Sequence, residues 1–151
     1  MRKKTRKRFT VNEIGLIRTP YKNVEEIPCQ SIRSKAKGTI LVYPEYAKGL
    51  KDIEGFSHIV VLYRFHKAKR YRLLGRPFLD NELRGIFSIR APRRPNYIGI
   101  STLKLEKRKG SMLKVSNADM LDGTPLLDIK PYVPQFEKRK KVRIGRLKGK
   151  V

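Results

Sequence analysis

The chain has 151 residues, of which 37 are Lys or Arg and 13 are Asp or Glu, so its formal net charge is +24. This length suits one domain, and a hydrophobic fraction of 39% is typical of a folded chain rather than a disordered one. A single cysteine, Cys29, excludes an internal disulfide and a cysteine-rich zinc site. No apolar run approaches the roughly 20 residues of a membrane span, and the basic N-terminus lacks the apolar stretch of a secretory signal. We therefore expect a soluble, cytoplasmic protein with a polyanionic partner, above all a nucleic acid.

The positive charge is concentrated at the two ends of the chain. Residues 1–8 hold six basic side chains and residues 138–151 hold eight, with no acid in either segment, which leaves +10 for residues 9–137. We predict one domain at 9–137 between a basic N-terminal arm (1–8) and a basic C-terminal arm (138–151), both flexible in the absence of a polyanion. Their composition is as typical of solubilising tails as it is of RNA-binding arms.

Short apolar runs separated by turn residues predict β-strands along the central domain. The expected strands lie within 9–18, 38–43, 58–65, 83–90, 98–107, 111–117 and 126–129, and the segment 107–110 is expected to form a hairpin connection. Helical periodicity is limited to 45–53 and to 67–74, the latter being either a short helix or a basic loop. The pattern favours an all-β fold, a small closed β-barrel with one or two short helices. There is no Gly-rich nucleotide-binding loop, which argues against a Rossmann domain.

The segment 90–99 is more polar and richer in proline than an ordinary strand connection. Pro92 and Pro95 restrict the backbone on either side of Arg93 and Arg94, so the loop presents guanidinium groups on a stiff support. Such a support suits phosphate or carboxylate recognition. The alternative is a rigid connection with solvated arginines. Tyr97 lies among these basic residues, a pattern compatible with stacking on a base.

A second polar segment, 119–132, gathers three carboxylates in a chain that is poor in acids. Asp122 and Gly123 mark a tight turn, with Asp119 before it and Asp128 after it. These carboxylates could accept hydrogen bonds from ribose hydroxyls or an ammonium group, although pairing with nearby arginines is the commoner outcome. Their spacing matches no metal-binding loop, and we expect no metal.

His66 and Lys67 form a third polar cluster at the end of the most apolar run. The ends of strands are where proteins commonly display binding groups. A lone histidine is more often packed or hydrogen-bonded than catalytic, so the residue type alone assigns no role to His66.

Ordered motifs run through the central domain, the last two being the most specific: 14–22 (IGLIRTPYK), 49–50 (GL) with 55–58 (GFSH), 85–90 (GIFSIR), 94–96 (RPN) with 98–99 (IG), and 121–125 (LDGTP) with 128–132 (DIKPY). Through these motifs the domain resembles, over about residues 12–136, the TsaA-like (TrmO-type) family of tRNA methyltransferases. Members of this family are small homodimeric β-barrels that bind S-adenosyl-L-methionine without a Rossmann domain. The bacterial type methylates N6 of threonylcarbamoyladenosine beside the anticodon of certain threonine tRNAs.

The resemblance implies a methyl-donor site and an RNA site. The donor-binding residues it implies are Ser31, Ile32, Arg33, His66, Lys67, Arg90, Ile100, Leu121, Asp122, Gly123 and Thr124. The residues expected to bind the tRNA are Arg93, Arg94, Asn96, Tyr97 and Lys130. Asp122, Asp128 and His66 are unranked candidates for the group that receives the proton from N6.

The sequence departs from the family pattern at Tyr97 and Cys29, in the short basic segment 67–82 and in its two basic arms. Tyr97 stands where the family usually has a second proline after Asn96, and Cys29 replaces a usual arginine. These departures leave the exact tRNA and the exact modified base open. Two alternatives stay open as well: a non-catalytic basic RNA-binding barrel, and a methyltransferase of the same fold that acts on another substrate.

Overall fold

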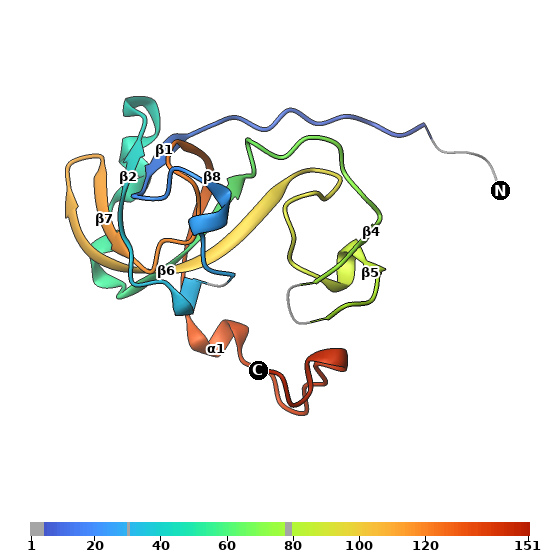
Figure 1. Ribbon diagram of the computed structural model, residues 1–151. Helices are drawn as coiled ribbons and strands as arrows, with labels where there is room; N and C mark the ends of the chain where they lie inside the picture. Colours follow the sequence, from blue (N-terminus) through green and yellow to red (C-terminus); the bar gives the residue numbers. More distant parts are fainter. Residues whose placement is uncertain (1–4, 30, 78–79) are drawn as a thin grey trace.

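The computed structural model describes residues 5–29, 31–77 and 80–151, and its main body is a closed barrel (Figure 1). Six antiparallel strands follow one another around it in the order β1-β2-β7-β6-β3-β8. These strands are β1 Gly15–Arg18, β2 Lys37–Val42, β3 His58–Arg64, β6 Ile98–Lys109, β7 Met112–Ser116 and β8 Thr124–Pro131. The predicted all-β barrel is confirmed, as is the hairpin between β6 and β7.

The core fills the inside of the barrel with aliphatic side chains that alternate along the strands. In β6, Leu103 and Leu105 point inward, whereas Lys104 and Glu106 are exposed. The period of two places one face of each strand inside, which is why the apolar runs predicted the strands. Closure pairs the sheet edges with each other, so the barrel leaves no long unpaired edge.

The short helices are mostly single turns in the connections between strands. They are η1 Val24–Glu26, η2 Ser31–Arg33, η3 Pro44–Leu50, η4 Ile53–Gly55, η5 Ile86–Ser88, α1 Pro134–Glu137 and η6 Gly145–Leu147. The helical segment predicted at 45–53 is found as η3 and η4, and most of 67–74 is a loop. No helix in the described ranges is long and apolar enough to cross a bilayer.

The prediction of a strand at 83–90 was wrong for most of that length. Within the segment only Arg84–Gly85 form a strand, β5, which pairs with β4 (Leu74–Gly75), and η5 follows directly. Ile86 and Ile89 are buried at a spacing of three residues, while Phe87 between them is 77% exposed. This helical spacing within a short apolar run cannot be told from a strand by composition alone.

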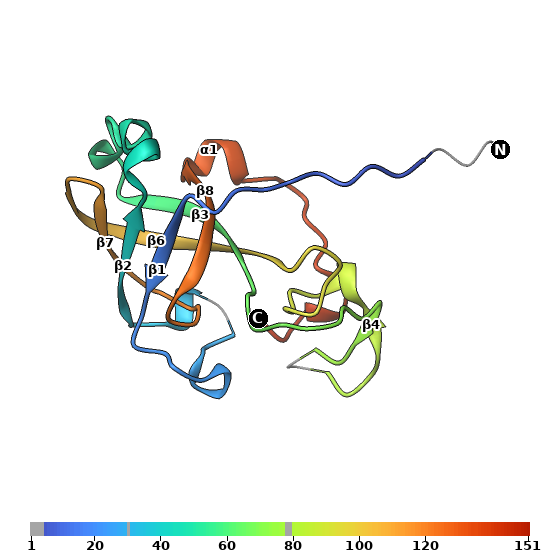
Figure 2. The same ribbon diagram turned by 90° about the horizontal axis from the view of Figure 1, so that it is seen from above.

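The β4–β5 pair belongs to a lobe beside the barrel, formed by the long connection between β3 and β6 (Figures 1 and 2). The C-terminal segment turns back toward this lobe, where Arg146 Nη2 donates a hydrogen bond of 3.2 Å to the Ser88 carbonyl oxygen. In the same lobe the hydrogen bond from the Glu82 amide and the contact with Arg84 lower the pKa of Asp80, and the charge of Lys150 adds a smaller effect in the same direction. Arg146 of the C-terminal arm thus contacts the lobe, while residues 138–145 are exposed. Residues 5–8 of the N-terminal arm are exposed and lack regular structure, and residues 1–4 lie outside the described ranges.

Candidate functional site

Several of the predicted site segments meet at one end of the barrel. β3 ends at Arg64, opposite Ile98 at the start of β6, and β8 begins at Thr124, opposite Ile17 near the end of β1. The Tyr97 carbonyl oxygen accepts a hydrogen bond of 2.8 Å from the Phe65 amide, which ties residues 90–97, here called the arginine-rich loop, to the residue before His66. In the same region η2, which contains Ser31, Ile32 and Arg33, contacts β6.

The turn at Asp122 is held to the end of β1 by the Asp122 carboxylate. Oδ1 accepts a hydrogen bond from the Thr19 amide at 3.0 Å and forms an ion pair with Arg18 Nε at 2.9 Å, and Oδ2 accepts a hydrogen bond from Lys22 Nζ at 2.6 Å. The hydrogen bond from Lys22, followed by the contacts from Thr19 and Arg18, holds the pKa of Asp122 below its ordinary value. Gly123 has a φ of +78°, which favours glycine at this point of the turn.

The inner side of the turn is closed by the Thr124 hydroxyl, which donates a 2.6 Å hydrogen bond to the Leu121 carbonyl oxygen. Thr124 is 2% exposed. The side chains of Asp122 and Thr124 therefore both fix the shape of the turn.

A buried chain of hydroxyl groups crosses from β3 to the loop before this turn. The Tyr63 and Ser101 hydroxyls are 2.9 Å apart, and Ser101 Oγ donates a 2.5 Å hydrogen bond to Asp119 Oδ1. Burial, followed by the Asp119 charge, raises the pKa of Tyr63, and the Arg90 guanidinium acts in the opposite direction. Arg90 is therefore close to this network although it comes from the lobe. In the sequence, Asp119 was one of three carboxylates offered for ribose hydroxyls, an ammonium group or pairing with arginines, and nothing in the local sequence pointed to Ser101.

His66 lies half-buried just beyond β3. Burial, together with the charges of Lys67 and Arg64, lowers its pKa below the ordinary value of about 6.5. The imidazole is therefore neutral at neutral pH and able to accept a proton.

The arginine-rich loop uses its arginines in two ways. Arg94 is half-buried and donates from Nη1 to the carbonyl oxygens of Ile89 at 2.9 Å and Ala91 at 3.3 Å, so it braces the loop itself. Arg90, Arg93 and Asn96 are exposed. Tyr97 is half-buried and has a φ of +53°, a backbone conformation uncommon for an aromatic residue.

Two of the predicted residues, Asp128 and Lys130, lie elsewhere. Asp128 stands opposite Leu62, midway along β3, and pairs with Lys130 at 2.8 Å on the outer face of β8. The structure thus does not bring Asp128 and Lys130 to the Asp122 turn. Ile100 is 49% exposed on the outer face of β6, so its side chain points away from the core.

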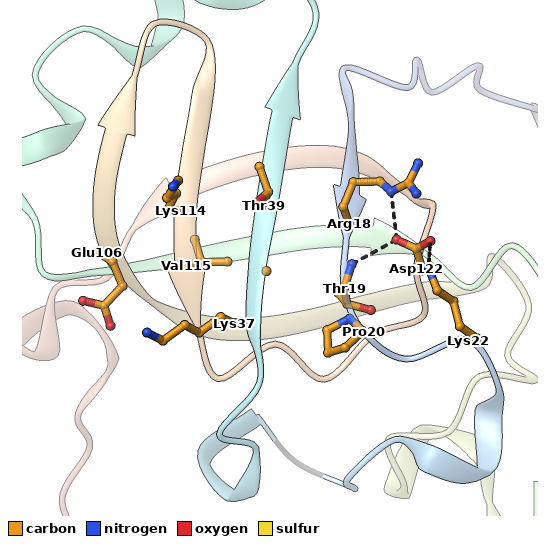
Figure 3. Close-up of a pocket in the computed structure, with 11 residues that line it drawn as sticks. Arg18, Thr19, Pro20, Lys22, Lys37, Thr39, Glu106, Lys114, Val115 and Asp122 are labelled. Atoms are coloured by element: carbon orange, nitrogen blue, oxygen red, sulfur yellow. Dashed lines mark hydrogen bonds and ion pairs between the residues drawn. The ribbon is translucent and has the colours of Figure 1, made fainter.

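An open groove of about 750 Å³ starts at the Asp122 turn and runs over the outer face of β1, β2 and β7 (Figure 3). Its charged side chains are Arg18, Lys22, Lys37, Lys114, Glu106 and Asp122, which give it a net charge of +2. Among the described residues, no group of three or more His, Cys, Asp or Glu side chains could hold a metal ion.

A family model and similar proteins of known sequence point to the same family. Residues 16–138 match the model of the tRNA-methyltransferase O N-terminal domain. A probable S-adenosyl-L-methionine-binding protein of Pyrococcus abyssi is 52% identical over 91% of this chain and 76% of its own length. A tRNA (adenine(37)-N6)-methyltransferase of Mus musculus is 38% identical over 83% of this chain but only 28% of its own length.

A solved structure of this family has the same fold. The crystal structure of TrmO from Pseudomonas aeruginosa superposes with a TM-score of 0.78 at 35% identity, covering 93% of this chain and 63% of that one. This chain therefore spans less than two thirds of that solved structure and less than a third of the mouse enzyme. The resemblance drawn from the motifs is confirmed: the chain belongs to the family of the tRNA-methyltransferase O N-terminal domain.

Proposed function

We propose that this protein is an S-adenosyl-L-methionine-dependent tRNA methyltransferase that acts on N6 of the adenosine beside the anticodon, in its threonylcarbamoyl form. The observation that carries the proposal is the convergence of three donor-site segments at one end of the barrel: η2, residues 66–67 and the 121–124 turn. The relatives named as S-adenosyl-L-methionine-binding proteins support the methyl donor, and the mouse relative supports the tRNA adenine. A tRNA-modifying role would place the protein in the cytoplasm.

The side chains at this end of the barrel suit the chemistry of the donor. S-adenosyl-L-methionine carries a carboxylate, an ammonium group and a flat apolar base. Arg33 and Arg90 are exposed cations for the carboxylate, and Asp119 offers a carboxylate for the ammonium group or the ribose. Ile32 and Ile100, 86% and 49% exposed, offer apolar surface for the base. When bound, the donor supplies an electrophilic methyl group.

Among the three candidates for the proton acceptor, we assign the role to His66. Its lowered pKa leaves a free lone pair at neutral pH, and it adjoins the arginine-rich loop through the contact of Phe65 with Tyr97. Both oxygens of Asp122 already accept charged or backbone donors, so we assign Asp122 to holding the turn. Asp128 is paired with Lys130 at a distance from the turn along β8.

The exposed part of the arginine-rich loop suits the RNA substrate. Arg93 and Asn96 are available for anticodon-loop phosphates or for the threonyl carboxylate, and Tyr97 for stacking on a base. Arg94 would support these contacts from within the loop rather than make them, because its guanidinium already binds two carbonyl oxygens.

Titration calorimetry with S-adenosyl-L-methionine tests the donor site. We expect micromolar binding, loss of most of that binding in Arg90→Ala, and no change in Arg143→Ala, which removes the same charge from the exposed C-terminal segment. No binding to the wild-type protein would leave the rival interpretation, a non-catalytic RNA-binding barrel. Equal affinity in both variants would contradict the role of Arg90.

The substrate is tested separately by mass spectrometry of tRNA nucleosides from cells with and without the protein. We expect the N6-methyl group on threonylcarbamoyladenosine to disappear with the protein. Donor binding together with an unchanged nucleoside profile would point to the second rival, a methyltransferase of this fold with another substrate.

We also propose that the protein is a homodimer, the assembly expected from the family resemblance. Ile98 and Ile100 are 40% and 49% exposed on the outer face of β6, beside the lobe. Covering them with a second copy would bury apolar surface and enclose the donor site. Sedimentation analysis should give a dimer for the wild-type protein and a monomer for Ile98→Lys; a monomeric wild-type protein would contradict the proposal.

A further inference from the structure

The groove over β1, β2 and β7 is a second positively charged surface, separate from the arginine-rich loop. Strand register places Arg18, Thr39 and Lys114 side by side on three adjacent strands, since Thr39 is the partner of both Arg18 and Lys114. Neighbouring strands lie about 4.8 Å apart, so cations on the outer two are about 10 Å from each other at the backbone. Lys37 lies two residues before Thr39 on the same face of β2.

The cations in the groove differ in how far their charge is already neutralised. Arg18 and Lys22 share Asp122 at the end of the groove nearest the turn. Lys37 is close enough to Glu106 to help lower its pKa, although the hydrogen bond from Ser116 and the charge of Lys104 contribute more. No ion pair found among the described residues involves Lys114. Lys37 and Lys114 therefore keep the most charge for an external partner.

The shape of the groove suits a polymer better than a small anion. A site for a single phosphate usually converges several donors on one point. Here the cations are spread along an open surface, and uncharged residues, Thr39 and Val115, lie between them (Figure 3). A chain with regularly spaced negative charges would meet them one after another.

We propose that this groove binds the sugar–phosphate backbone of the RNA substrate and holds it in line with the methyl-donor site. The proposal rests on the proposed function for the identity of the RNA. Its own support is that the groove is continuous with the Asp122 turn, so a strand that leaves the donor site along this face passes directly over Lys37 and Lys114. Contacts of this kind set register and affinity without reading sequence.

The test compares two double variants of equal charge. Lys37→Ala with Lys114→Ala removes the two least neutralised cations of the groove. Lys48→Ala with Lys51→Ala removes two exposed lysines at and just after η3, in the connection that follows β2 at the other end of the barrel. The affinity for unmodified tRNA transcript is measured from 50 to 300 mM salt, and the affinity for S-adenosyl-L-methionine is measured alongside.

We expect the groove variant to bind tRNA at least about tenfold more weakly at 0.1 M salt. Its slope of log affinity against log salt should fall by roughly 1.4–1.8, because each lost phosphate contact removes about 0.7–0.9. The control variant should keep both the affinity and the slope of the wild-type protein. Donor affinity should be unchanged in both variants.

Equal effects of the two double variants would overturn the proposal and would show that only the total charge matters. A groove-dependent affinity for poly-glutamate, with tRNA binding that does not depend on the groove, would overturn it in favour of an acidic protein partner. These outcomes are distinct from failure of the proposed function. If tRNA binding depends on the groove but the protein does not bind S-adenosyl-L-methionine, the proposed methyltransferase function is contradicted and the groove proposal stands. If the protein binds S-adenosyl-L-methionine but tRNA binding does not depend on the groove, the groove proposal is contradicted and the proposed function stands.

Discussion

The hydroxyl groups of Tyr63 and Ser101 lie 2.9 Å apart inside the barrel, where the two residues are 4% and 5% exposed. Ser101 also donates a hydrogen bond to Asp119, so one small side chain connects β3 to the loop before the Asp122 turn. A buried hydroxyl that loses its hydrogen-bond partner destabilises the fold, because its lost contact with water is no longer compensated. The position of Asp119 in the candidate donor site therefore depends on a residue in the middle of a strand.

Replacement of Ser101 by alanine should lower the free energy of unfolding by about 1–3 kcal/mol, since both Tyr63 and Asp119 lose a partner. Chemical denaturation measures this change. Ser116→Ala is the matched control, because the Ser116 hydroxyl bonds to the exposed Glu106, and it should cost less than about 0.5 kcal/mol. If the two variants are equally stable, the buried network does not contribute to stability as we describe.

Gly99 allows the Tyr63 ring to pack against β6. A Cβ atom at position 99 would overlap the aromatic rings of Tyr63 and Phe65. Gly99→Ala should therefore destabilise the protein by about 1–3 kcal/mol through overpacking. Gly55→Ala is the control, because a Cβ atom there would meet nothing within 4 Å. A thermal unfolding midpoint that falls equally in both variants would contradict a packing role specific to Gly99.

The strands of the barrel could be predicted because their pattern is local. β3 lies within a near-continuous apolar run, and β6 and β7 flank a basic turn ending in Gly110, so each is visible in a few consecutive residues. The segment 83–90 could not be resolved in this way, because a short apolar run fits a strand and a helical turn equally well. The structure resolves it by burying Ile86 and Ile89 together.

The candidate site was predictable only where its chemistry depends on a turn or on a family motif. The turn at Asp122 and Gly123 is visible in the sequence, as is the stiff loop around Arg93. Ser101 is hidden in a strand, and its partnership with Tyr63 exists only because β3 pairs with β6 in one register. The basic groove likewise draws Arg18, Lys37 and Lys114 from three strands that only the closed barrel brings together.

The pKa of His66 depends in part on its neighbour Lys67. Burial and the charges of Lys67 and Arg64 lower this pKa, so Lys67→Ala should raise it toward the ordinary value of about 6.5. Lys69→Ala, an exposed lysine two residues further on, should have little effect. An NMR titration of the imidazole, assigned with His66→Gln, measures both changes. An equal rise in the two variants would show that the effect comes from total charge rather than from Lys67.

The lowered pKa of His66 also predicts a dependence of stability on pH. Because the pKa in the folded protein is below that in the unfolded chain, the unfolded state binds more protons as the pH falls through about 6.5. Acidification through this range should therefore destabilise the wild-type protein, and Lys67→Ala should reduce that loss. Unfolding curves between pH 7.5 and pH 5 measure the difference, and a larger loss in Lys67→Ala than in the wild-type protein would contradict the sign.

The lowered pKa of the Asp122 carboxyl group also predicts a dependence of stability on pH, in a more acidic range than that of His66. Its carboxyl is held below the ordinary pKa of about 3.9 by Lys22, Thr19 and Arg18, so the stability it provides is complete above that value and is lost as the pH falls through the folded pKa. Asp122→Asn keeps an oxygen for the Thr19 amide and removes the charge. Because Arg18 and Lys22 are 57% and 64% exposed, Asp122→Asn should lower the free energy of unfolding near pH 6 by only about 1 kcal/mol, and this deficit should shrink toward pH 3.

Asp52→Asn is the control, because it removes the same charge from an exposed loop residue. Its effect on the free energy of unfolding should be small at both pH values. A deficit in Asp122→Asn that stays constant from pH 6 to pH 3 would show that the amide group disturbs the turn and that the ion pairs contribute nothing.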